Sequence, residues 1–62
     1  MKATQSYRLQ IQAYMDEIEL LTGGRFREDY PAIMQQYCDF SNADDLNGLF
    51  MIMVTLEDML KD

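Results

Sequence analysis

Histidine is absent from this chain of 62 residues, and cysteine and proline each occur once. Without histidine, the Ser/His/Asp and Cys/His arrangements of nucleophilic catalysis and histidine-ligated metal sites are excluded. The single cysteine, Cys38, closes no internal disulfide and offers no cluster for zinc, so we interpret it as a packing residue. Small domains need a disulfide, a metal or self-association for stability, and the sequence therefore predicts self-association.

Basic residues are scarce. The chain has five Lys and Arg against eleven Asp and Glu, its net charge is −6, and Lys61 is the one basic residue after position 27. An acidic field disfavours direct binding of DNA, RNA or anionic lipid, which are held by patches of Lys and Arg. It suits a basic protein partner, and we expect such a contact face to use Asp39, Asp44, Asp45, Asp58 and Asp62.

Long hydrophobic segments are missing as well. The longest uninterrupted apolar run, residues 49–54, is far shorter than the roughly 20 residues that cross a bilayer. Met1 and Lys2 are followed by polar residues rather than by the apolar segment of a signal peptide. These features predict a cytoplasmic protein that does not enter a membrane.

Residues 46–60 are the most apolar stretch, and they predict a helix. The length of the pattern and the helix-start residues Ser41-Asn42 and Asp44-Asp45 favour a helix from about 43 to 60 over a strand at 49–54. Met51 lies in its polar stripe, whereas Ile52, Val54 and Met59 widen its apolar face, so the helix must be covered on two sides. Its core-facing residues recur at steps of three and four: Leu46, Leu49, Phe50, Met53, Leu56 and Leu60.

Residues 3–22 predict a first helix, which Gly23 and Gly24 end because glycine readily takes the left-handed conformation of a C-terminal cap. A second apolar ridge on its opposite side comprises Leu9, Ala13 and Leu20. Two ridges indicate two neighbours. The main stripe should pack lengthwise on the inner face of the 43–60 helix, and it comprises Tyr7, Ile11, Tyr14, Ile18 and Leu21.

A short helix is predicted over residues 31–40, because Pro31 suits the first turn of a helix. The connector before it carries two arginines beside the glycine pair, which is one way to hold an anion. Two acids in the same connector neutralise them locally, so we expect ion pairs to the acidic helices and Phe26 packed inward. The inward residues of the short helix are Tyr30, Ile33, Tyr37 and Phe40.

Together these segments predict an all-α protein with one domain, residues 1–62, and helices at 3–22, 31–40 and 43–60. The two long helices match in length and are expected to lie antiparallel, as a long-short-long helical hairpin. The apolar surface exceeds what one small chain covers, so homodimerisation should complete a helical bundle. The interface residues that we expect are Leu9, Ala13, Leu20, Met51, Ile52 and Met59.

Other chemistry finds little support in the sequence. Residues 39–50 place oxygens as a calcium loop does, but they lack glycine at the sixth position and glutamate at the twelfth. A short helix, a turn and a second helix could also form a DNA-binding helix-turn-helix. Its recognition helix would place Asp44 and Asp45 against the DNA phosphates, which repel them, so we reject this interpretation. No phosphate-binding loop, nucleophile elbow or dinucleotide fingerprint occurs, so we expect no cofactor, no metal site and no enzymatic activity.

The function that we expect is that of a non-enzymatic, homodimeric regulatory or adaptor protein acting through protein–protein interaction. Two alternatives stay open: an acidic inhibitor that mimics a nucleic acid on a basic protein, and a structural subunit of a larger assembly.

Overall fold

The computed structural model describes residues 3–61, and these residues form helices without any strand. The elements are α1 (Ala3–Leu21), α2 (Phe26–Asp29), α3 (Pro31–Asn42) and α4 (Leu46–Lys61). The predicted all-α class and the order of the three main helices are confirmed, and the single turn α2 is an addition that the sequence did not predict. No helix among residues 3–61 combines the length and apolar character needed to cross a membrane.

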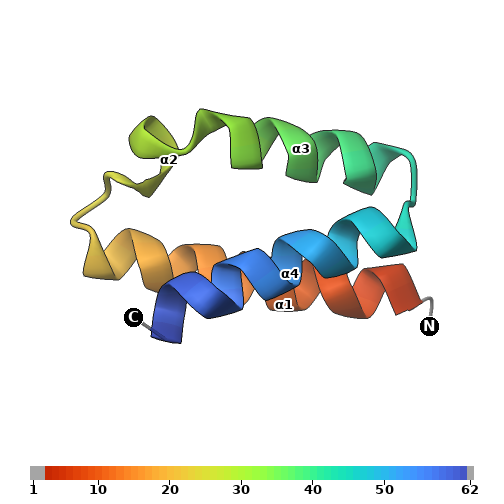
Figure 1. Ribbon diagram of the computed structural model, residues 1–62, viewed down its shortest axis with the longest axis horizontal. Coiled ribbons are helices and arrows are strands. Elements are labelled where there is room, and N and C mark those ends of the chain that lie inside the picture. The colour runs from red at the N-terminus through yellow and green to blue at the C-terminus, as the bar shows by residue number, and fades with distance from the viewer. Residues whose placement is uncertain (1–2, 62) are drawn as a thin grey trace.

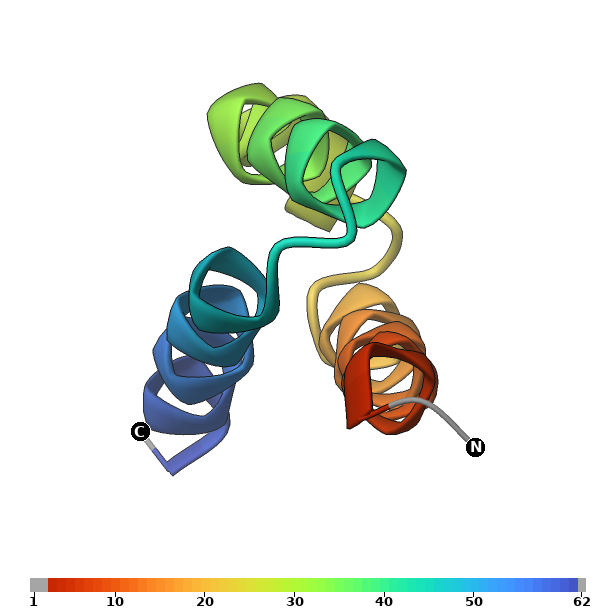
Figure 2. The same ribbon diagram turned by 90° about the vertical axis from the view of Figure 1, so that its right-hand side faces the viewer.

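Successive members of the three longer helices run in opposite directions. α1 and α4 both run from right to left in Figure 1, and α3 returns the chain in the opposite direction above them. Seen from the end, the three helices stand at the corners of a triangle (Figure 2). The expected antiparallel hairpin of the two long helices is therefore wrong, because α3 carries the chain back along most of their length before α4 begins.

The end of α1 is set by the glycine pair, as predicted. Gly23 has a φ of 68°, a left-handed conformation in which a side chain would be strained. The Gly24 N–H donates to the Glu19 carbonyl at 2.8 Å and the Gly23 N–H donates to the Leu20 carbonyl at 3.4 Å. This pair of bonds is a Schellman motif, which satisfies carbonyls that the helix end leaves free.

The corner between α3 and α4 differs from the prediction. α3 continues through Ser41 and Asn42, and the chain turns at Asp44, which has a φ of 55°. The Asp45 N–H donates to the Phe40 carbonyl at 2.9 Å, and the Asp45 carboxylate accepts the Gly48 N–H at 3.1 Å. A second Schellman motif thus ends α3, and Asp45 caps α4. The predicted start at 43 with a Ser41-Asn42 cap is wrong because left-handed Asp44 interrupts the helical path.

The side chain of Asp44 ties this corner to the beginning of α1. Its carboxylate accepts the Thr4 hydroxyl at 2.6 Å and the Arg8 guanidinium at 3.0 Å. Arg8 also donates to the Ser41 hydroxyl at 2.8 Å and to the Ser41 carbonyl at 2.7 Å. Thr4 is buried although it is polar, and its bond to Asp44 satisfies it. These contacts align the starts of α1 and α4.

The core forms mainly between α1 and α4. Ile11 and Ile18 are buried as predicted, with Tyr7 and Tyr14 at the edge, and Met15 is a further buried residue that the stripe did not include. On α4, Leu49 and Leu56 are buried as predicted, but the buried side is rotated toward Ile52, which is 4% exposed, while Phe50 is 46% exposed. The buried apolar residues are Ile11, Met15, Ile18, Phe26, Leu49, Ile52 and Leu56.

The short helix α2 brings one aromatic ring into the core. Phe26 is fully buried, as predicted, and its ring lies 5.6 Å from that of Tyr30. The backbone N–H of Arg27 donates to the Glu19 carboxylate of α1 at 3.1 Å, so an acid of the first helix satisfies a free donor in the first turn of α2. The single turn therefore connects α1 to α3 while filling the end of the core.

α3 covers the pair from one side without any fully buried residue. Its Ile33, Tyr37 and Phe40 are partly buried against the core, as predicted, whereas Cys38 is exposed and not a packing residue. The Phe40 ring lies directly on the backbone of α4: a Cβ added at Gly48 would stand 2.5 Å from Phe40 Cγ. Gly48 is thus buried beneath the Phe40 ring of α3.

Substitution Gly48→Ala tests this contact. In an open helix, alanine is more favourable than glycine by about 1 kcal/mol. Here the new methyl group collides with the Phe40 ring, and overpacking of this kind costs about 1–3 kcal/mol. We expect a net loss of unfolding free energy of about 1 kcal/mol in urea denaturation.

Asn47→Ala at the exposed neighbouring position is the matched control, and its change should stay within about 0.5 kcal/mol. In a Phe40→Ala background, which removes the ring together with its Cγ, Gly48→Ala should stabilise the protein relative to Phe40→Ala alone. A stabilised Gly48→Ala protein in the native background would contradict the contact.

Candidate functional site

One part of the apolar surface that the fold leaves exposed follows α4. Leu46, Phe50 and Val54 succeed one another at every fourth position and are 42%, 46% and 38% exposed. Residues four apart lie on one line of a helix, so the three side chains form a continuous stripe. The Tyr7 ring of α1 stands 5.9 Å from that of Phe50 and extends the apolar surface toward α1. We call Tyr7, Leu46, Phe50 and Val54 the α4 stripe.

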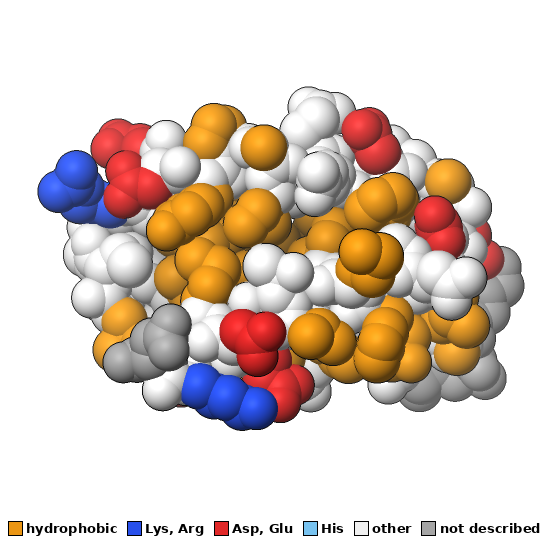
Figure 3. All heavy atoms as spheres, in the orientation of Figure 1, with side chains coloured by type: hydrophobic (Ala, Val, Ile, Leu, Met, Phe, Trp, Pro, Cys, Tyr) orange, Lys and Arg blue, Asp and Glu red, His pale blue; other side chains and the backbone are white. Residues whose placement is uncertain are grey.

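The α4 stripe lies on the side of the α1–α4 pair that faces away from α3. Arg8 and Gln12 of α1 and Gly48 of α4 mark the opposite side, because all three contact α3. Figure 2 shows α3 above the pair and no helix of the described chain below it. Figure 3 shows hydrophobic side chains gathered along the right part of the lower edge, where the first halves of α1 and α4 lie in Figure 1. Among residues 3–61 the three longer helices thus leave open the position that a fourth long helix takes in a four-helix bundle.

Charge is low along this side of the pair. Lys61 pairs with Glu57 at 3.5 Å, one turn apart near the end of α4, and the two charges offset each other. The residues of the α4 stripe carry none. The stripe itself is therefore uncharged in a chain whose net charge is −6, and such depletion of charge is typical of the centre of a protein–protein interface.

The predicted interface residues fall in three different places. Leu9 and Leu20 are 53% and 84% exposed on the side of α1 opposite the core, with exposed Ala13 between them. Met51 is 68% exposed on α4, about 100° around the helix from Phe50. Met59 is partly buried against the core of its own chain.

Ile52 lies in the core of its own chain. Its exposed fraction is 4%, because it packs in the core between α1 and α4. The α4 stripe takes the place that the prediction gave to Ile52 and Met59, and three of its members, Tyr7, Leu46 and Phe50, had been expected to face the core. The recurrence of apolar residues at every fourth position was visible in the sequence. The apolar arc of this helix was too wide, however, to show which of its residues stay exposed to solvent.

The predicted acidic contact face divides in a similar way. Asp44 is bound by Thr4 and Arg8, and Asp45 caps α4, so both carboxylates stabilise the fold. Asp39 accepts a hydrogen bond from Gln35 at 3.1 Å, one turn earlier on α3. Asp58 is exposed, and Asp62 lies outside the described residues. The structure therefore does not gather the four described acids on one surface.

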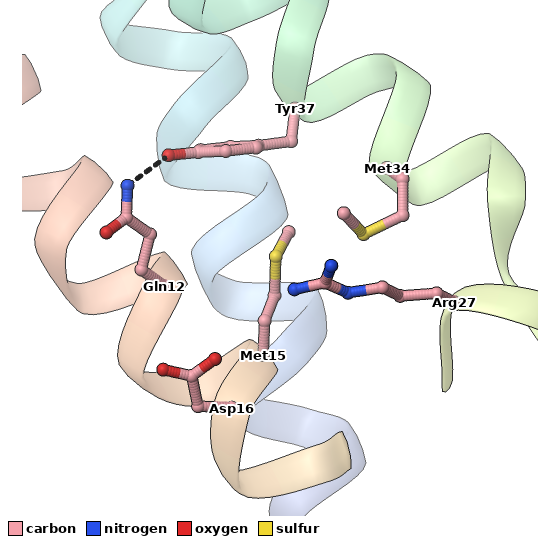
Figure 4. A pocket seen from close by; sticks show the side chains of 6 residues that line it. All are labelled: Gln12, Met15, Asp16, Arg27, Met34 and Tyr37. Atoms are coloured by element: carbon pink, nitrogen blue, oxygen red, sulfur yellow. Dashed lines mark hydrogen bonds between the residues drawn. The ribbon is translucent and has the colours of Figure 1, made fainter. Parts of the chain in front are cut away.

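An open pocket lies between α1, α2 and α3 (Figure 4). Its volume is about 290 Å³. Gln12 donates a hydrogen bond to the Tyr37 hydroxyl at 3.2 Å across one end. No group of three metal-ligating side chains occurs among residues 3–61. The lining offers hydrogen bonds, two opposite charges and apolar contact, and it comprises Gln12, Met15, Asp16, Arg27, Met34 and Tyr37.

Comparison with known proteins supplies no family for this chain. The sequence gives no significant match to a protein-family model, a curated protein or a solved structure.

Two acids of the predicted contact face allow a direct test of their roles. Asp45→Ala removes the cap of α4 and should lower the unfolding free energy by about 1 kcal/mol. Asp58→Ala changes an exposed acid of the same helix and should change it by less than about 0.5 kcal/mol. Urea denaturation of both variants measures the difference, and equal effects would show that Asp45 does not act as a cap.

Proposed function

We propose that this protein is a non-enzymatic interaction protein of the regulatory or adaptor kind that works as a homodimer, with the α4 stripe of each copy covered by the other. The observation that carries the proposal is the continuous, uncharged apolar stripe on the side of the α1–α4 pair that α3 leaves open. Its side chains are of the type that fills the core of a helical bundle.

The size of the core supports a dimer. Seven apolar side chains are buried in the described part of the chain, and domains shorter than about 70–80 residues rarely obtain more than about 3–5 kcal/mol from a single core. Apolar surface removed from water contributes about 25 cal/mol per Å². A second copy that covers Leu46, Phe50 and Val54 would therefore add appreciably to the small stabilisation that the core of one chain provides.

The distribution of charge favours a second copy over a basic protein at this surface. Two molecules with a net charge of −6 repel each other least when they meet through surfaces without charge. A twofold axis across the stripe would place Phe50 of each copy near the same residue of the other. The exposed acids and the ridge of Leu9, Ala13 and Leu20 then stay accessible to a different protein partner.

The alternative of an acidic nucleic-acid mimic is less well supported. Asp44 and Asp45 were central to it, and the fold uses both of them. A mimic needs a row of acids that are free to face a basic groove. A structural subunit of a larger assembly would use the ridge of Leu9, Ala13 and Leu20 to contact further copies. It predicts oligomers larger than a dimer, and sedimentation velocity separates the two.

Sedimentation velocity tests the dimer between about 1 and 100 µM, the range in which interfaces of moderate size dissociate. We expect the unmodified protein to shift from monomer to dimer as its concentration rises. Phe50→Glu should weaken the dimer by at least about tenfold, because it buries a charge in the apolar interface. Circular dichroism should show unchanged helix content, since Phe50 is half exposed.

Leu20→Glu is the matched control, because Leu20 is an exposed apolar residue outside the stripe. It should leave the monomer–dimer equilibrium unchanged. A compact monomer for the unmodified protein at about 100 µM, or dissociation by Leu20→Glu and not by Phe50→Glu, would refute the proposed interface.

A further inference from the structure

We propose that the pocket between α1, α2 and α3 binds a free α-amino acid with an apolar side chain. This is a small-ligand site in addition to the proposed dimer surface, and it lies on the α3 side of the molecule, away from the α4 stripe. The inference rests on the placement of two opposite charges over an apolar floor.

The two charges stand on different elements. Arg27 extends from α2 across the pocket toward α1, and Asp16 lines the same pocket from α1, on the other side of the Met15 side chain in Figure 4. The ion pairs among residues 3–61 are Arg8 with Asp44 and Lys61 with Glu57, so Arg27 and Asp16 are not paired with each other. Both are exposed at the rim and are therefore accessible from solvent.

This arrangement matches the charges of a zwitterion. A guanidinium group binds a carboxylate through two parallel hydrogen bonds, and a carboxylate accepts hydrogen bonds from an ammonium group. An α-amino acid carries both partner groups on one carbon atom and can satisfy Arg27 and Asp16 together. A simple carboxylic acid or a simple amine satisfies one of them and leaves the other without a partner.

The floor of the pocket selects an apolar side chain. Met15 is 3% exposed and closes the bottom, while Met34 and Tyr37 form partly buried walls. Thioether side chains adapt to the shape of an apolar ligand. The hydrogen bond from Gln12 holds the Tyr37 ring at one end. The volume of about 290 Å³ is at the lower end of the range of about 300–1,000 Å³ for ligand pockets, which indicates a ligand of amino-acid size.

A titration followed by two-dimensional ¹H–¹⁵N NMR on the whole chain tests this site. L-Leucine is the probe, and 4-methylpentanoate and 3-methylbutylamine are its analogues without the ammonium and without the carboxylate. We expect L-leucine to shift the amides around the pocket saturably with a dissociation constant of about 1 mM, since rim charges are partly screened. Each analogue should bind at least about tenfold more weakly.

Arg27→Gln and Asp16→Asn should each weaken L-leucine binding by about tenfold. Arg25→Gln and Glu17→Gln change neighbouring exposed charges that do not line the pocket, and they should have no effect. No saturable shift at about 20 mM L-leucine, an affinity of either analogue equal to that of L-leucine, or an unchanged affinity in both pocket variants would overturn the proposal. Because Phe50→Glu leaves the pocket intact, a monomeric variant should bind L-leucine as the dimer does, and failure of one proposal leaves the other standing.

Discussion

The corner at Asp44 is the constraint on which the arrangement of the helices depends. A non-glycine residue with a positive φ is unfavourable unless its surroundings hold it there, and aspartate tolerates this conformation better than most residues. Thr4 and Arg8 bind its carboxylate, and Arg8 also binds Ser41. The end of α3, the beginning of α4 and the beginning of α1 are therefore joined at one point. From this point α1 and α4 run in the same direction, which leaves α3 as the helix that returns.

A pair of parallel helices with a third helix over one side has a covered side and an open side. On the covered side, close packing of Phe40 on Gly48 and the buried Phe26 complete the core. On the open side, Leu46, Phe50 and Val54 stay partly exposed, and no helix of the described chain lies over them. The proposed dimer surface and the proposed ligand pocket thus belong to opposite sides of the same pair, and both follow from where α3 lies.

Much of the secondary structure was predictable because its signals are local. The glycine pair ends α1, Pro31 begins α3, and Phe26 packs inward as expected. The rotation of α4 was not predictable, since its apolar arc is wider than its contact with α1, and either Phe50 or Ile52 would satisfy a helical wheel. The contact of Gly48 with Phe40 selects Ile52, and that contact joins two helices. The pocket likewise combines Asp16, Arg27 and Tyr37 from three elements.

The shallow packing of α3 has a consequence for motion. Its residues are at most partly buried, whereas α1 and α4 share the buried core, so α3 requires the least free energy to detach locally. Amide protons of α3 should consequently exchange with solvent faster than those at the centre of α1 and α4. Each such opening separates Met34 and Tyr37 from Gln12 and uncovers Gly48 on α4. The pocket therefore exists only while α3 is closed, and any ligand that occupies it holds α3 in place and slows the exchange of its amides.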